Sequence, residues 1–107
     1  MEEVIRIGSQ ILGGEKTFII AEVGSNHCQD LKIAYETIDA AVEAGADAIK
    51  FQSIRIDKLY LNPSQEIIDL HAKIDFDESW HKLLNQYCKK RILFSFLPLL
   101  IWKQLIY

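Results

Sequence analysis

The sequence predicts an α/β fold in which parallel strands alternate with helices, and three observations indicate it. Two short apolar runs, at residues 17–23 and 48–52, are typical of strands that are buried on both faces of a parallel sheet. Between them, apolar residues recur at helical spacing over residues 31–44. A strand, a helix and a second strand in this order form a β-α-β unit with a right-handed crossover.

Local signals mark the ends of the predicted helices. Asp30 is a suitable N-cap because its carboxylate can accept hydrogen bonds from the first helical turn, and Gly45 supplies a stop because glycine tolerates the left-handed conformation at helix ends. A second helix, capped by Asp77, is predicted at residues 78–90, and a third strand begins at residue 92. The alternation of strand and helix therefore continues.

Two segments lie outside this alternation. Residues 5–7 and 11–12 are short apolar runs separated by turn residues, which predicts a β-hairpin within residues 1–16. Residues 53–75 have mixed polarity and are expected to form a long loop with one helical turn near residues 67–70. Long loops after strands often carry function. The candidate side chains of this loop, whose spacing is not diagnostic, are Asp57, Tyr60, Asn62 and Glu66.

The composition excludes several classes of protein. Half of the 107 residues are hydrophobic and the net charge is −3, so we expect one small globular domain. Acidic and basic residues are interspersed, so neither a nucleic acid nor a membrane is an expected partner. The first residues lack the features of a secretory signal, which predicts a cytoplasmic protein with reduced thiols. Cys28 and Cys88 lie far apart without a CxxC pair, so neither a disulfide nor a structural zinc site is expected.

The candidate site follows from the alternation of side chains along the strands. Glu22 shares a face of the first strand with Ile20, and Lys50 shares a face of the second strand with Gln52. The opposite faces are purely apolar and belong against the helices. Glu22, Lys50 and Gln52 should therefore meet on the other side, at the carboxyl ends of adjacent strands, where barrel enzymes have their active sites.

Three roles remain open for Lys50 on these grounds. A lysine inside a strand is unfavourable unless an acid or an anion pairs with it, so Lys50 could form a purely structural ion pair with Glu22. It could instead hold the phosphate or carboxylate of a substrate as a point charge. It could also be the Schiff-base lysine of a barrel aldolase.

Two blocks of sequence carry a family resemblance. Residues 18–27, Phe-Ile-Ile-Ala-Glu-Val-Gly-Ser-Asn-His, and residues 44–52, Ala-Gly-Ala-Asp-Ala-Ile-Lys-Phe-Gln, resemble the opening of the N-acetylneuraminate (sialic acid) synthase family. This family includes legionaminic and pseudaminic acid synthases and a spore-coat polysaccharide synthesis protein. The resemblance runs from about Ile5 to Phe94. It implies the N-terminal portion of a TIM (β/α)8 barrel, with about two and a half βα units preceded by the β-hairpin.

The resemblance also implies an activity. Family members condense phosphoenolpyruvate with an N-acetylated hexosamine of the N-acetylmannosamine type, which gives a nonulosonic acid and phosphate for carbohydrate and surface polysaccharide biosynthesis. A divalent metal, Mn²⁺ or Mg²⁺, polarises the sugar aldehyde in the complete family enzyme, and its histidine ligands lie on later strands. The resemblance therefore assigns no metal ligand to this chain. Family members form homodimers.

Carried over residue by residue, the resemblance assigns roles on the two strands. Lys50 would contact phosphoenolpyruvate, and Glu22 and Gln52 would bind and orient the sugar, so that Glu22 and Lys50 are the catalytic candidates. Asn26 and His27 would shape the substrate-binding loop after the first strand, with His27 more structural than ligating.

Other positions depart from the family or have no assigned role. The family continues Asn-Gly after the histidine, whereas this chain has Cys28 and Gln29, so the resemblance leaves open which amino sugar is bound. His71 is expected in the loop and His81 on the second helix. Neither has an acidic partner at ligand spacing in the sequence, which favours a solvated or packing role for both.

The C-terminal tail departs further. Family members continue Ser-Thr-Pro-Phe-Asp after the third strand, whereas residues 96–102 read Phe-Leu-Pro-Leu-Leu-Ile-Trp. One back-translation of residues 98–107, read from its third base, encodes the family-like peptide Pro-Phe-Asp-Leu-Glu-Ala-Val-Asp-Leu. We therefore expect a frameshift near residues 95–97, an out-of-frame tail at residues 96–107, and a partial barrel domain over residues 1–107 that is inactive alone. The alternative is a non-catalytic remnant of a disrupted gene or an interaction fragment.

Overall fold

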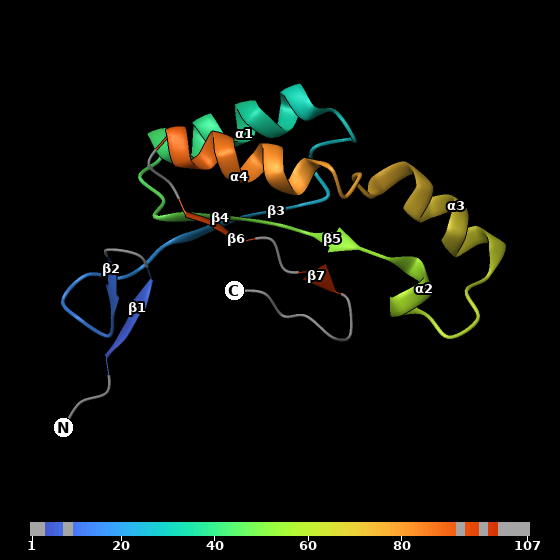
Figure 1. Ribbon diagram of the computed structural model, residues 1–107, viewed down its shortest axis with the longest axis horizontal. Helices are drawn as coiled ribbons and strands as arrows, with labels where there is room; N and C mark the ends of the chain where they lie inside the picture. The colour runs from blue at the N-terminus through green and yellow to red at the C-terminus, as the bar shows by residue number, and fades with distance from the viewer. Residues whose placement is uncertain (1–3, 8–9, 92–93, 97–98, 101–107) are drawn as a thin grey trace.

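The computed structural model describes residues 4–7, 10–91, 94–96 and 99–100. Its main sheet has three parallel strands in the order β3-β4-β6 (Figure 1). Two helices, α1 and α4, lie together over one face of this sheet. The bounds of these elements are β3 Ile20–Gly24, α1 Leu31–Glu43, β4 Ala48–Phe51, α4 Trp80–Lys90 and β6 Phe94–Phe96. The predicted α/β class and the parallel pairing of the first two main strands are confirmed.

The strand β3 begins later than the predicted residue 17. The backbone of Ile19 bonds to the turn before β4 instead of joining the ladder, because its N–H donates to the Asp47 carboxylate at 2.9 Å. Its carbonyl accepts hydrogen bonds from the N–H groups of Asp47 and Ala48. These bonds fasten the two strands at their amino ends.

The predicted hairpin is present. β1 (Ile5–Ile7) and β2 (Gln10–Leu12) are antiparallel, with Ile5 opposite Leu12. This hairpin precedes the main sheet and lies away from the two covering helices (Figure 1).

The helix ends agree with the sequence at two positions and differ at one. Asp30 accepts a hydrogen bond from the Lys32 N–H at 2.9 Å, and Gly45 follows α1 with a φ of +85°, so both predicted signals are confirmed. The prediction that Asp77 caps the next helix is wrong, because the N-cap of α4 is Ser79. Asp77 instead accepts the Ser79 N–H at 2.7 Å and orders the turn before the helix.

The expectation of a long loop over residues 53–75 is wrong, although the helical turn expected near residues 67–70 does lie within a helix. This segment contains β5 (Ser53–Ile54), α2 (Ile56–Leu59) and α3 (Gln65–Ile74). The helix α3 begins where the Ser64 hydroxyl accepts the Ile67 N–H at 3.3 Å. Most residues of α3 are exposed, including the apolar residues Ile68 and Leu70.

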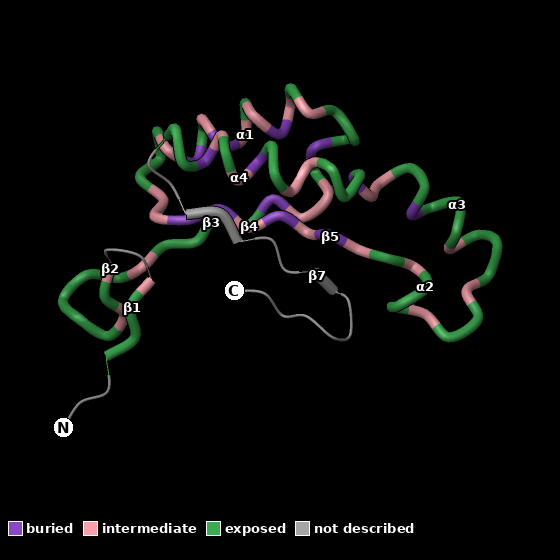
Figure 2. Tube along the Cα trace, in the orientation of Figure 1, coloured by how far each residue is buried: buried purple, intermediate pink, exposed green. Residues whose placement is uncertain are grey.

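The core lies between the main sheet and its two covering helices, where buried residues concentrate (Figure 2). Its largest fully buried apolar side chains are Phe51 and Ile49 of β4, Ile38 of α1 and Leu84 of α4. The helices are also joined by Tyr87, whose hydroxyl donates to the Asp39 carboxylate at 2.9 Å. The predicted division of strand faces is therefore confirmed, since the apolar face of β4 packs on the helices.

The C-terminal prediction lies largely outside the described residues. The third strand was expected from residue 92, and the described strand β6 begins at Phe94. Within the expected out-of-frame tail the structure describes Phe96 and β7 (Leu99–Leu100), which pairs in parallel with β5. No helix in the described ranges is long and apolar enough to cross a membrane.

Candidate functional site

A lysine and a glutamate lie opposite each other on two neighbouring strands of the main sheet. Glu22 of β3 is the direct ladder partner of Lys50 of β4, and the Lys50 Nζ lies 3.6 Å from the Glu22 Oε1. The Lys50 side chain is 41% exposed and that of Glu22 is 66% exposed. Both charges therefore lie on the face opposite the helices, as the alternation of side chains predicts.

An irregularity of the ladder follows directly after this pair. The register shifts between Glu22 and Gly24, and Gly24 has a φ of +61°, a conformation that favours glycine. A Cβ at Gly24 would lie 3.9 Å from the side-chain oxygen of Gln52. The N–H of Gln52 donates to the Gly24 carbonyl at 3.4 Å. Gln52 therefore lies beside Gly24, at the carboxyl end of β3.

The loop after β3 separates the two residues that were expected to act there. Asn26 is exposed in a turn in which its N–H donates to the Val23 carbonyl at 3.2 Å. His27 is fully buried in the core, with its ring 5.3 Å from that of Phe76 and 5.4 Å from that of Trp80. Asn26 therefore lies at the surface of the protein, whereas His27 is buried against the aromatic rings of the core.

The environment of His27 defines its protonation. Its Nδ1 accepts the Gln29 N–H at 3.0 Å, so the neutral ring carries its proton on Nε2. Burial lowers the pKa of His27, and the negative charge of Asp75 partly opposes this shift. A neutral, buried imidazole is consistent with the structural role that the sequence favoured.

The two residues that depart from the family pattern form an unusual turn. Cys28 and Gln29 have φ values of 54° and 57°, in the left-handed region that side-chain-bearing residues rarely adopt. The Gln29 side-chain amide donates to the carbonyl of Ala72 at 2.9 Å and to the carbonyl of Asp75. This side chain therefore ties the loop after β3 to the end of α3.

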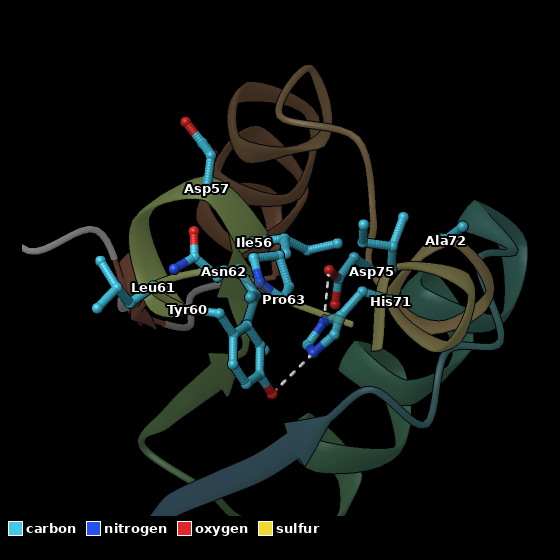
Figure 3. Close-up of a pocket in the computed structure, with 11 residues that line it drawn as sticks. Ile56, Asp57, Tyr60, Leu61, Asn62, Pro63, His71, Ala72 and Asp75 are labelled. Carbon is cyan, nitrogen blue, oxygen red and sulfur yellow. Dashed lines mark hydrogen bonds and ion pairs between the residues drawn. The ribbon is translucent and has the colours of Figure 1, made fainter. Parts of the chain in front are cut away.

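A pocket of about 730 Å³ lies between α2, the turn that follows it, and α3 (Figure 3). At one end the Tyr60 hydroxyl lies 3.2 Å from the His71 Nε2, and the His71 Nδ1 lies 2.8 Å from the Asp75 Oδ2. His71 is only 5% exposed. The expectation that His71 lies in a loop without an acidic partner is therefore wrong. The four-residue spacing of His71 and Asp75 would have been the signal, once a helix had been predicted there.

His81 also has a partner that the sequence did not indicate. It bonds through Nε2 to the Ser53 hydroxyl at 2.8 Å, which joins α4 to β5. Burial lowers the pKa of His81, and the charge of Glu78 partly opposes this shift. His81 therefore has the packing role that was expected.

The described part of the chain does not contain a metal site. No three His, Cys, Asp or Glu side chains gather there in a way that could hold an ion. The described residues therefore offer no ligand set for the divalent metal that the family resemblance implies.

The structure thus shows a parallel α/β sheet with two helices on one face and a lysine–carboxylate pair on the other. Residues 37–97 match the NeuB family, and the chain belongs to this family.

Three relatives illustrate the match. The Bacillus subtilis spore coat polysaccharide biosynthesis protein SpsE is 38% identical over 84 residues, which cover 69% of this chain and 22% of that protein. Human N-acetylneuraminate-9-phosphate synthase is 44% identical over 88 residues, covering 82% of this chain and 23% of the relative. The crystal structure of N-acetylneuraminic acid synthetase from Leptospira borgpetersenii, in complex with citrate, superimposes with a TM-score of 0.82 at 32% identity. This match covers 94% of the present chain and 35% of the solved one.

Proposed function

We propose that this chain is the N-terminal portion of a nonulosonic acid synthase. The complete enzyme condenses phosphoenolpyruvate with an N-acetylated hexosamine of the N-acetylmannosamine type, and it releases phosphate. The chain supplies about two and a half βα units of a (β/α)8 barrel, with the tail at residues 96–107 out of frame. The observation that carries this proposal is the Glu22–Lys50 pair on the open face of the sheet, in a member of the NeuB family.

The proposed roles follow from the charge and position of each side chain. The Lys50 ammonium binds the phosphate or carboxylate of phosphoenolpyruvate as a point charge. The Glu22 carboxylate accepts hydrogen bonds from sugar hydroxyls, and the Gln52 amide orients the sugar beside it. Asn26, exposed in the turn after β3, closes this end of the substrate site. In the reaction C3 of phosphoenolpyruvate attacks the sugar aldehyde, water adds to C2, and phosphate leaves.

The exposure of the charged pair favours a role in binding over a purely structural one. Ion pairs between exposed side chains stabilise a protein by only about 0–1 kcal/mol. The Lys50 and Glu22 side chains are 41% and 66% exposed, so their pairing is a weak reason for a lysine within β4. Binding of an anionic substrate by Lys50 is a stronger reason for a lysine at this position.

The surroundings of Lys50 give less support to a Schiff-base aldolase. A nucleophilic lysine is activated by an apolar environment or by a neighbouring cation. Lys50 is instead partly exposed and has a carboxylate as its neighbour. Reduction with borohydride in the presence of a carbonyl substrate should leave Lys50 unmodified, and a covalent adduct at Lys50 would restore the aldolase proposal.

The substitution Lys50→Ala tests the proposal in a complete barrel that carries these residues. Loss of a charge-assisted contact worth about 1.5–3 kcal/mol lowers kcat/KM for phosphoenolpyruvate by about 10- to 150-fold. The control is Lys32→Ala, because Lys32 is an exposed lysine of α1 whose nearest carboxylate is Glu36 at 3.9 Å. Steady-state kinetics that are unchanged in Lys50→Ala would reduce Lys50 to a structural ion pair.

A further inference from the structure

The pocket beside α3 is lined by apolar side chains, by Asp57 and Asn62, and at one end by the hydrogen-bonded Tyr60, His71 and Asp75 (Figure 3). It is distinct from the candidate catalytic site, because neither Glu22 nor Lys50 lines it. Its volume of about 730 Å³ lies within the range that small-molecule sites occupy. The apolar residues that line it are Ile54, Ile56, Leu61, Pro63, Ile68 and Ala72.

Hydrogen-bond roles at the polar end determine what the pocket can accept. A carboxylate only accepts, so the His71 Nδ1 carries the proton that Asp75 receives. The neutral ring then accepts through Nε2, which makes the Tyr60 hydroxyl the donor in its bond to His71. The Tyr60 oxygen retains its lone pairs. A ligand in this pocket must therefore present a donor to Tyr60.

The carboxylate at this end has His71 as its side-chain partner in the described contacts. The Asp75 side chain is 15% exposed, and its Oδ1 is a buried atom with no hydrogen-bond partner among the described residues. No lysine or arginine is among the described residues that line the pocket. The other lining carboxylate, Asp57, already has Arg55 at 3.0 Å. A nearby cation stabilises a carboxylate that is largely buried.

We infer that this pocket binds a small organic cation, namely a protonated amine on an apolar carbon body. The ammonium donates a hydrogen bond to the Tyr60 oxygen and compensates the charge of Asp75. The carbon body packs against the apolar walls. This site is independent of the proposed synthase activity, since it shares no residue with the Glu22–Lys50 pair.

The test compares three ligands that share one carbon body and differ in the head group. The 107-residue chain, labelled with ¹⁵N, is titrated with cyclohexylammonium, cyclohexanol and cyclohexanecarboxylate. We expect saturable shifts at Tyr60 and Ala72 with the ammonium, about tenfold weaker binding of the alcohol, and none of the carboxylate. Equal or tighter binding of the carboxylate, or no saturable binding of the ammonium, overturns the inference.

Two variants locate the site. Tyr60→Phe removes the acceptor oxygen without altering the ring, and it should weaken binding of the ammonium by about tenfold. Asp75→Asn removes the charge and should abolish the preference for the ammonium over the alcohol. The control is Asp69→Asn, because Asp69 is an exposed carboxylate of α3 that bonds only locally to Gln65 in the described contacts. If Asp75→Asn does not fold, Tyr60→Phe still decides, and unchanged affinity in Tyr60→Phe contradicts the inference.

Discussion

Gln29 holds a backbone conformation that its own residue type disfavours. Its φ of 57° lies in the left-handed region, where a Cβ crowds the following carbonyl at a cost of about 1–2 kcal/mol. Its side chain offsets this by donating to the carbonyls of Ala72 and Asp75 at the end of α3. One residue therefore links two loops that are more than 40 positions apart, as the separations of 43 and 46 residues show.

Substitutions of Gln29 should separate these two effects. Gln29→Ala loses the hydrogen bonds and keeps the left-handed strain, so it should lower the free energy of unfolding by about 1–3 kcal/mol in urea denaturation. Gln29→Gly loses the same bonds but relieves the strain, and it should be more stable than the alanine variant by about 1 kcal/mol. Gln65→Ala is the control, because the Gln65 amide bonds only to the exposed Asp69 in the described contacts. Equal stability of the Gly and Ala variants would show that the backbone at residue 29 leaves the left-handed region.

His81 should make folding sensitive to pH. Burial lowers its pKa in the folded protein below the value of about 6.5 in the unfolded chain, so the unfolded chain binds more protons at acidic pH. The stability that this residue contributes is therefore present above about pH 6.5 and is lost as the pH falls. His27 acts in the same direction, since burial also lowers its pKa.

Chemical denaturation at several pH values checks this. We expect the free energy of unfolding to decrease between about pH 7.5 and about pH 5, and His81→Gln should reduce that decrease. The neighbouring exposed residue Lys82 provides the control, because Lys82→Gln should leave the slope unchanged. A slope in His81→Gln as steep as in the parent chain would assign the pH dependence to other groups.

At the scale of elements, two helices begin with a serine but use it differently. The Ser64 hydroxyl accepts the Ile67 N–H at the start of α3. Ser79 precedes α4 in a helical backbone conformation and makes no capping bond, because its hydroxyl bonds to Asp77 instead. The same residue type therefore stabilises one helix end directly and orders the preceding turn at the other.

This difference predicts unequal effects of removing the two hydroxyls. Ser64→Ala should lower the free energy of unfolding by about 1 kcal/mol, because an N–H of the first turn of α3 loses its acceptor. Ser79→Ala should lower it by clearly less, since it removes only an exposed bond to Asp77. Urea denaturation of both variants makes the comparison. Similar losses in the two would contradict the assignment of Ser64 as the stronger cap.

At the scale of the whole molecule, one face of the sheet is covered and the other carries the charged pair. Both α1 and α4 pack on the same face of β3-β4-β6 (Figure 1). Glu22 and Lys50 are partly exposed on the opposite face. The chain spans 22% and 23% of the two curated relatives described above. The remaining parts of such a relative would supply the other substrate contacts under the proposed function.

We therefore predict that the 107-residue chain alone does not release phosphate from phosphoenolpyruvate with N-acetylmannosamine and manganese. A chain extended in the restored frame near residues 95–97 should release it, and Lys50→Ala in that extended chain should lower kcat/KM for phosphoenolpyruvate by about 10- to 150-fold. A phosphate assay run side by side decides. Turnover by the short chain would refute the prediction of inactivity. A downstream sequence that encodes no barrel continuation in any frame would favour the non-catalytic remnant.

The local features of this fold follow from the sequence by itself. Alternation along a strand needs only the neighbouring residues, so the apolar faces of β3 and β4 and the exposed Glu22–Lys50 pair were predictable. The cap at Asp30 and the stop at Gly45 are equally local. Of the helix α3 only one turn, near residues 67–70, was predicted, and its full extent from Gln65 to Ile74 came from the structure.

Only the tertiary structure decided which distant residues meet. The bonds from Gln29 to the end of α3, the burial of His27 against Phe76 and Trp80, and the bond of His81 to Ser53 join positions far apart in the chain. The Tyr60–His71–Asp75 chain likewise required α3 to form and the turn after α2 to fold back onto it. Such contacts depend on the path of every intervening residue, whereas periodicity and caps depend on a few neighbours. For this reason the sequence determined the charged pair on the sheet, and the tertiary structure alone decided the pocket beside α3.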